Sequence, residues 1–474
     1  MEKLRIGNIG RFLFAAMAVL SVVDVSAARR NYFLAPTFDD DFDLPITRAS
    51  DYRDEIGTRK YPWNMSFKDW FEAPYAMPMR RYVLEDMGVV PTVVYLGNFA
   101  SNPVGGRSRG AAMASNVNFD LGVDFGKLTG RKALDGFALG NAWSWRFGNN
   151  LSAERVGNNF TTQQVYGNPT MRFQSLFLSY RKTVCDDWTV FVKLGRFAAG
   201  DNFATSPIYW LYQNNAFDGN PVGIFKQQRM SAYPSGTWAA YMRVDYKDGQ
   251  YFKAGVYKIS TDEQDSPHQH GLDWSIGGEG VNANFELGWN FNHDGSGKSP
   301  ASISAGIAAD WYNVPYVQST TIATDFSYSL YLQADYMLIN LGAPKSDAPR
   351  GSYIVRDSDS YRDLRGLIIW GVIEYNPNYD TAEMPLFING GLLFNAPFES
   401  RADDVVCFGA AYGLFSDRLT TYNSGSYELA FELNYKFQVN KFFFLQPNVQ
   451  YIVHTNGGEY PDALVLGLQF GLNL

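Results

Sequence analysis

Charged and amide side chains recur at alternate positions in several segments of this 474-residue chain. Glu428, Glu432 and Lys436 do so within 427–439, and Asn448 and Gln450 do so within 443–453. The same pattern holds upstream for Arg243, Asp245, Glu286, Gln333 and Asp335. Successive side chains of a strand point to opposite faces, so this spacing gathers the polar groups on one face. Such a face can hydrogen-bond a neutral polar solute, whereas its mixed charges suit a strong ion filter poorly. The alternative for each charged residue is plain hydration of that face.

The opposite face of these segments is apolar. In the final segment it carries Leu464, Leu466, Leu468, Phe470, Leu472 and Leu474, and 119–125, 238–246, 283–291 and 326–338 alternate in the same way. A soluble sandwich also alternates, but these segments match the about 9–11 residues that cross a bilayer at a tilt. Trp238 and Tyr246 also stand at strand ends, where membrane barrels place aromatic girdles. We therefore predict that lipid covers the apolar face and that water reaches the polar one.

A sheet with one face in lipid must close, because an open edge leaves unpaired backbone groups in hydrocarbon. The fold class that we predict is therefore all-β: a transmembrane antiparallel β-barrel over 89–474, apolar outside and polar inside. Seventeen candidate strands can be drawn, of which the one near residue 272 is weak. Bacterial single-chain barrels have an even strand number, so we predict sixteen strands, with eighteen as the alternative.

The longest connection, 197–235, is rich in aromatic residues. Short turns such as the one at Asp248–Gly249 face the periplasm in these barrels, and long loops face outward. Long loops without secondary structure are usually functional, and one with this many aromatic side chains favours burial over exposure to water. We predict that it folds into the barrel mouth as a constriction loop, with a plain external cap as the alternative. The loop residues that we select are Tyr209, Trp210, Tyr212 and Arg229.

The first residues form a targeting signal. A positive start, an apolar core and the small residues Val25-Ser26-Ala27 predict a signal peptide over 1–27, with a retained anchor as the alternative. Residues 28–88 form a separate N-terminal segment, which we predict to be partly helical.

The composition excludes several classes of protein. With a formal charge of -8 and no basic run, nucleic acid is not an expected partner. Four His and two Cys provide few ligands for zinc and no disulfide scaffold. We predict no catalytic residues, no metal site and no cofactor. Cys185 and Cys407 are expected to be separate thiols, although an oxidising compartment would allow them to pair.

Several stretches, in this order and spacing, resemble the carbohydrate-selective porin (OprB-like) family. They are Arg81–Gly88, Asn102–Gly106, Asp124–Gly130, Leu194–Arg196, Asp201–Ala204, Tyr233-Pro234, Gln446–Ile452 and Ala463–Leu468. The resemblance implies a sixteen-stranded barrel in the bacterial outer membrane that passes small sugars by passive diffusion. The expected partners are these sugars, outer-membrane lipid and the barrel-assembly machinery, and the barrel is a monomer or a homotrimer.

Two other functions remain open at this point. One is a general, plugged, structural or adhesive barrel. The other is an outer-membrane enzyme, which is disfavoured because His454 is the only histidine expected on a strand and points inward in our register.

Overall fold

The protein is a closed barrel of sixteen antiparallel strands in a computed structural model. The structure describes residues 88–167, 170–185, 187–247, 249–260, 270–272, 274–293, 297–342, 364–402, 404–419, 426–439 and 443–473. The predicted signal peptide (1–27) and all of the N-terminal segment except Gly88 lie outside the described residues.

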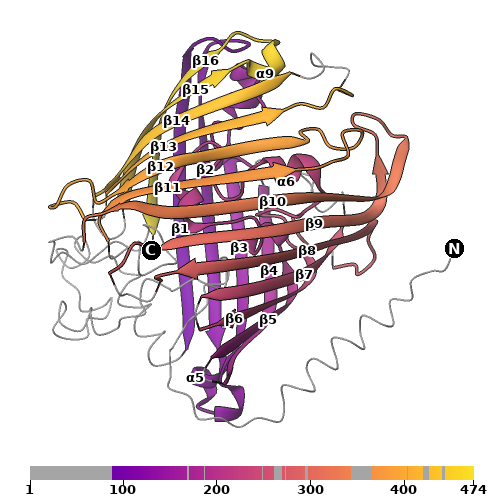
Figure 1. Ribbon diagram of the computed structural model, residues 1–474, viewed down its shortest axis with the longest axis vertical. Coiled ribbons are helices and arrows are strands. Elements are labelled where there is room, and N and C mark those ends of the chain that lie inside the picture. Colours follow the sequence, from indigo (N-terminus) through magenta and orange to yellow (C-terminus); the bar gives the residue numbers. More distant parts are fainter. Residues whose placement is uncertain are drawn as a thin grey trace.

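The strands follow one another around the barrel in chain order, and β16 closes the ring against β1 (Figure 1). They are β1 (Val89–Val104), β2 (Gly110–Asp124), β3 (Phe137–Gly148), β4 (Thr170–Cys185), β5 (Trp188–Phe197), β6 (Thr237–Tyr246), β7 (Gln250–Ile259), β8 (Gly280–Phe291), β9 (Ala301–Pro315), β10 (Ile322–Asn340), β11 (Gly366–Tyr375), β12 (Leu386–Asn395), β13 (Val405–Leu414), β14 (Tyr427–Gln438), β15 (Phe443–Val453) and β16 (Ala463–Asn473). Sixteen strands confirm the prediction. The weak candidate near residue 272 forms no strand in its described part, 270–272 and 274–279.

Short helical elements lie in the connections. They are α5 (Phe125–Thr129), η3 (Lys132–Leu134), η4 (Ser152–Val156), η5 (Ala199–Asp201), η6 (Pro207–Leu211), α6 (Gly223–Gln227) and α9 (Thr455–Gly458). No helix among the described residues has the length and apolar character needed to cross a membrane.

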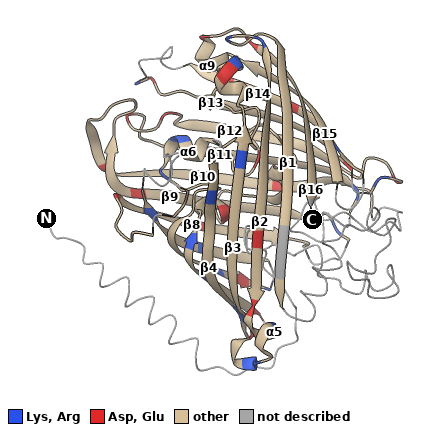
Figure 2. Cartoon of the chain, turned by 180° about the vertical axis from the view of Figure 1, so that it is seen from behind, with Lys and Arg blue, Asp and Glu red and all other residues tan. Residues whose placement is uncertain are grey.

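The alternation in the sequence divides the wall into an outer and an inner face. On β16, Leu466 and Leu468 are 43% and 37% exposed, whereas Val465, directly before Leu466, is 0% exposed. The apolar row therefore lies on the outside of the barrel, as predicted, and not in a compact core. Most of the ribbon is uncharged, and charged positions occur singly within strands such as β2 as well as in the connections (Figure 2).

The two ends of the barrel differ in their connections. The β6–β7 turn is tight, with Gly249 N donating to Tyr246 O at 2.9 Å, and the β14–β15 connection leaves from the same end. We call this the turn end and the opposite one the loop end. One connection at the turn end, 341–365, is long, and most of it lies outside the described residues.

The inner face is not polar throughout. Ile368 and Trp370 of β11, Leu393 of β12 and Cys407 of β13 point inward and are buried in one apolar cluster. The prediction of a polar interior is therefore wrong on the arc from β11 to β13. The physical reason is that protein, not water, covers this part of the wall.

Candidate functional site

The connection between β5 and β6, residues 198–236, lies inside the barrel; we call it the inner loop. The Tyr209 hydroxyl donates to Gln333 Oε1 of β10 at 3.1 Å, and the Tyr212 hydroxyl donates to Phe408 O of β13 at 3.1 Å. Trp370 Nε1 donates to the Tyr212 hydroxyl at 2.9 Å. Contacts with three strands confirm that the loop folds inward, so the external-cap alternative is wrong. Burial raises the pKa of Tyr209 and Tyr212, which keeps both hydroxyls protonated as donors.

Apolar packing holds the same part of the loop. Leu211, Tyr212, Ala216 and Phe217 share the apolar cluster with the inner side chains of β11 to β13. The Tyr209 and Tyr212 rings stand 4.9 and 5.5 Å from the Trp370 ring, centroid to centroid. Aromatic pairs at this spacing add to the area that they bury, so the loop is docked on the wall by a dry interface.

Glu432 of β14 anchors the centre of the inner loop. Its carboxylate accepts hydrogen bonds from Gln213 N at 3.0 Å and from Asn214 N at 2.8 Å. Asn434 Nδ2 also donates to it at 2.7 Å. The side chain is fully buried, so it holds the backbone of the loop and presents no surface to a solute.

Polar groups of β9 and β10 hold the last part of the loop. Asp310 Oδ2 of β9 accepts from Arg229 N at 2.7 Å. Gln228 Nε2 donates to the hydroxyls of Ser327 and Ser329 of β10 at 3.1 and 3.0 Å. The inner loop is thus held along the arc of wall from β9 and β10 to β14.

A second connection also enters the barrel, and our sequence analysis missed it. The described part of the β3–β4 connection, 149–167, is called here the mouth loop. Glu428 Oε1 of β14 accepts from Asn159 N and Phe160 N at 2.9 Å each. Gln450 Nε2 of β15 donates to Thr162 O at 2.9 Å. The stretch Asn158–Gln164 could have indicated this burial, because side-chain amides surround a single aromatic residue, Phe160. A large aromatic side chain is usually buried, and the amides around it can hydrogen-bond the barrel wall.

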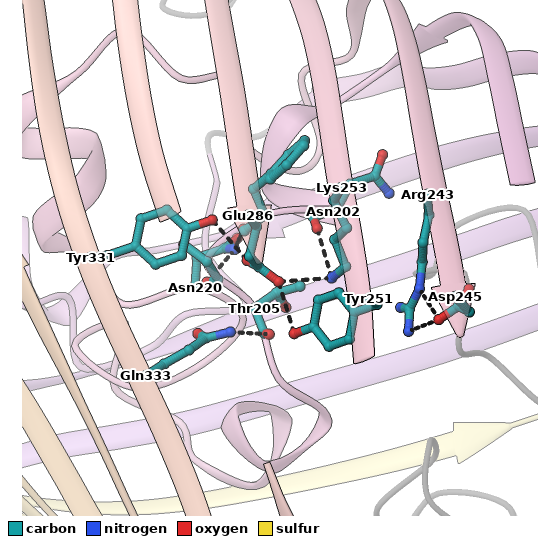
Figure 3. A network of polar contacts seen from close by, with 12 residues as sticks. Asn202, Thr205, Asn220, Arg243, Asp245, Tyr251, Lys253, Glu286, Tyr331 and Gln333 are labelled. Carbon is teal, nitrogen blue, oxygen red and sulfur yellow. Dashed lines mark hydrogen bonds and ion pairs between the residues drawn. The ribbon is translucent and has the colours of Figure 1, made fainter. Parts of the chain in front are cut away.

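A buried polar network connects β7, β8 and β10 beside the inner loop (Figure 3). The Glu286 carboxylate lies 3.2 Å from Lys253 Nζ and accepts from the Tyr251 and Tyr331 hydroxyls at 3.0 and 2.7 Å. Lys253 Nζ also donates to Asn202 O of the loop at 3.2 Å. Separating the members of a buried ion pair would leave each charge uncompensated, which is strongly unfavourable. The network therefore holds β7, β8 and the inner loop in one arrangement.

Arg243 and Asp245 of β6 lie next to this network (Figure 3). Arg243 Nη2 is 2.7 Å from Asp245 Oδ1, and the guanidinium lies 4.5 Å from the centre of the Tyr251 ring. Arg243 is buried, but 30% of the Asp245 side chain is exposed. The pair therefore presents its acid, not its base, to the lumen.

The remaining predicted residues also separate by exposure. Asn448, Lys436 and Gln450 are buried; Lys436 Nζ lies 4.4 Å from the Phe444 ring centre, and Gln450 Oε1 accepts from Asn214 Nδ2 of the inner loop at 2.9 Å. Asp335 and Arg229 are partly exposed, and Trp210 is 38% exposed. Of the fourteen residues selected from sequence, only Trp210, Arg229, Asp245 and Asp335 thus retain an accessible side chain.

His454 lies just past the end of β15, not on a strand as expected, and its ring stacks on Tyr427 at 4.4 Å. Cys185 is exposed, Cys407 is buried, and the two are separate thiols, as expected.

The family model for carbohydrate-selective porins of the OprB family matches residues 108–474. The chain belongs to the OprB family. This family consists of porins, which are transport channels and not enzymes, and the protein is accordingly a porin that passes sugars by passive diffusion through an outer-membrane barrel.

Solved structures support the same fold. The high-pH structure of Pseudomonas putida OprB is 20% identical, covers 88% of this chain and 99% of its own, and superposes with a TM-score of 0.70. The low-pH structure of the same protein is 17% identical, covers 86% of this chain and 97% of its own, and has a TM-score of 0.50. Comparison with curated proteins gives no match.

Proposed function

We propose that sugars cross this porin beside the inner loop, along the inner face of β6 to β10, and that Trp210, Arg229, Asp245 and Asp335 contact them. The proposal rests on the exposure of the predicted site residues, because some of them are buried and others keep an accessible side chain. Buried side chains such as Glu432 hold the loops, whereas these four remain accessible within the barrel.

The chemistry of the four side chains suits a sugar. The flat face of Trp210 packs against the apolar C–H face of a pyranose ring. Asp245 and Asp335 accept hydrogen bonds from hydroxyl groups, and Arg229 donates to them. Contacts at partly solvated side chains are weak enough for release, as passive diffusion requires.

The inner loop narrows the path in this proposal and does not move during transport. Its dry interface with β11 to β13 and its hydrogen bonds to β9, β10 and β14 support a fixed constriction. We further propose that the loop end faces the cell exterior, that the turn end faces the periplasm, and that residues 1–27 are removed on export.

Planar-bilayer recording tests the path. The wild-type barrel should conduct in steps, and an added sugar should reduce the current. Asp335→Asn removes one charged acceptor and should weaken the sugar block about fivefold with little change in open conductance. Trp210→Ala should weaken it to a similar degree. A barrel without stepwise conductance would instead be a plugged one, and unchanged block in both variants would place the path elsewhere.

A further inference from the structure

The tip of the β1–β2 hairpin is held rigidly at the loop end. Asn102, fully buried, donates from Nδ2 to Gly105 O and Ser108 O at 3.0 and 2.8 Å and accepts from Gly110 N at 3.0 Å. Two backbone hydrogen bonds join the tip to η4: Arg107 N to Val156 O at 2.9 Å and Ser108 N to Arg155 O at 2.8 Å. Side chains on this tip and on η4 are therefore presented from one fixed frame.

Three arginines project from this frame. Arg107, Arg109 and Arg155 are all exposed, and none of them forms an ion pair within the described residues. Arg107 Nη2 donates to Ala153 O at 2.6 Å, which orients one guanidinium. By contrast, Arg418, another exposed arginine of the loop end, lies 2.8 Å from Asp380. Glu154 of η4 is exposed beside Arg155 and accepts from Asn149 Nδ2 at 2.7 Å, so one acid stands next to three bases. The three arginines are called here the arginine patch, and with Glu154 counted they still leave a positive surface in a chain whose formal charge is -8.

The arginine patch begins where the apolar outer band ends. Val104 is the last residue of β1, is 54% exposed, and pairs with Leu464 of β16. Arg107 and Arg109 follow within five residues, so they stand beyond the acyl chains at the level of the lipid headgroups. Guanidinium groups match phosphate oxygens with two parallel hydrogen bonds, which makes a fixed group of arginines a phosphate site.

We propose that the arginine patch binds the phosphate groups of outer-leaflet lipid, the lipid A part of lipopolysaccharide. The proposal rests on the orientation given above, with the loop end outside. Exposed arginines at headgroup level that form no ion pair in the described structure are stabilised by the negative charge of anionic lipid.

The test compares two lipids on the full-length barrel refolded in detergent without lipopolysaccharide. Lipid A with both phosphates and the same lipid A after dephosphorylation are titrated, and bound lipid is counted by native mass spectrometry. The wild type should prefer the phosphorylated lipid. The triple variant R107Q/R109Q/R155Q should bind it about tenfold more weakly. The matched control R131Q/K132Q/K182Q removes three charges at the turn end and should bind like the wild type.

The outcomes separate the alternatives. Equal affinity of the wild type for the two lipids, or unchanged affinity in the triple variant, overturns the proposal. A triple variant that keeps its lipid affinity but is blocked less by a sugar phosphate in bilayer recordings also overturns it, because the arginine patch would then recruit solutes. Heat-modifiable gel mobility confirms that each variant is folded. If the triple variant does not fold, Arg109→Gln alone should still lower the affinity for phosphorylated lipid measurably, and no change there overturns the proposal.

Discussion

Replacing Glu432 tests whether the inner loop is a fixed constriction. Glu432→Ala removes the acceptor of two backbone N–H groups of the inner loop, Gln213 N and Asn214 N, and of Asn434 Nδ2. Hydrogen bonds to a charged group are worth about 1.5–3 kcal/mol, and the loop donors stay buried without a partner in the variant. We expect the docked loop to lose about 3 kcal/mol in free energy, which raises the ratio of undocked to docked loop roughly hundredfold.

Two assays measure this change. Urea unfolding of the folded barrel should give a lower midpoint, and single-channel recording should show excursions to higher conductance as the loop leaves the lumen. Glu399→Gln is the matched control, because Glu399 pairs with Arg365 at 3.2 Å at the turn end and is exposed. An exposed pair is worth about 0–1 kcal/mol, so this control should leave conductance unchanged. Glu432→Ala channels with wild-type noise and a wild-type midpoint would refute the anchoring role of this carboxylate.

An impermeant maleimide should label Cys185 but not Cys407 in the folded barrel, and Tyr212→Ala should expose Cys407 to label, as peptide mapping by mass spectrometry can show. Burial, and next the Glu432 carboxylate, raise the pKa of Asp218 in the inner loop well above its usual value, although Arg146 and Lys436 oppose the shift. In the folded state Asp218 therefore stays protonated to a higher pH than in the unfolded state. The free energy of unfolding then falls as the pH rises from about 3.9, the usual pKa of Asp, through the raised pKa of the folded state. Asp218→Asn should remove that loss, so urea midpoints of variant and wild type should agree at low pH and diverge at neutral pH; parallel pH profiles would contradict this. Lys253→Met breaks the buried pair with Glu286 and should lower the free energy of unfolding by about 3–5 kcal/mol, whereas a midpoint within error of the wild type would show that the pair is dispensable.

The barrel itself was predictable because one physical requirement acts on every strand. Each strand must present lipid with an uncharged row, and the row from Leu464 to Leu472 shows this without any knowledge of its neighbours. Closure follows from the cost of an open edge in hydrocarbon, and the even strand number removes the weak candidate near residue 272. These rules are local, so the sequence contains enough information to apply them.

The inner face was less predictable, because alternation tells which side a residue faces but not what lies there. Glu432 and Asp335 both face inward, yet the first is fully buried under the inner loop and the second is partly exposed. The difference comes from contacts between residues more than two hundred positions apart, such as Gln213 with Glu432. The alternation within one strand carries no information on such distant pairs. Several residues that we expected to contact sugar, such as Glu432, therefore bind the backbone of a loop in the structure.

One local signal does bear on where an inner loop docks. A strand between lipid and water needs only one apolar face, whereas β11 is apolar on both faces from Leu367 to Ile373, up to the inward Glu374. Ile369 and Ile373 face outward and are exposed, and Ile368, Trp370 and Val372 face inward and are buried. Exposing such an inner row to water is unfavourable, because burying each of these side chains stabilises the protein by about 1.5–3 kcal/mol. A continuous apolar run in one strand of an otherwise alternating barrel therefore indicates that protein covers its inner face, and in this porin that protein is the inner loop.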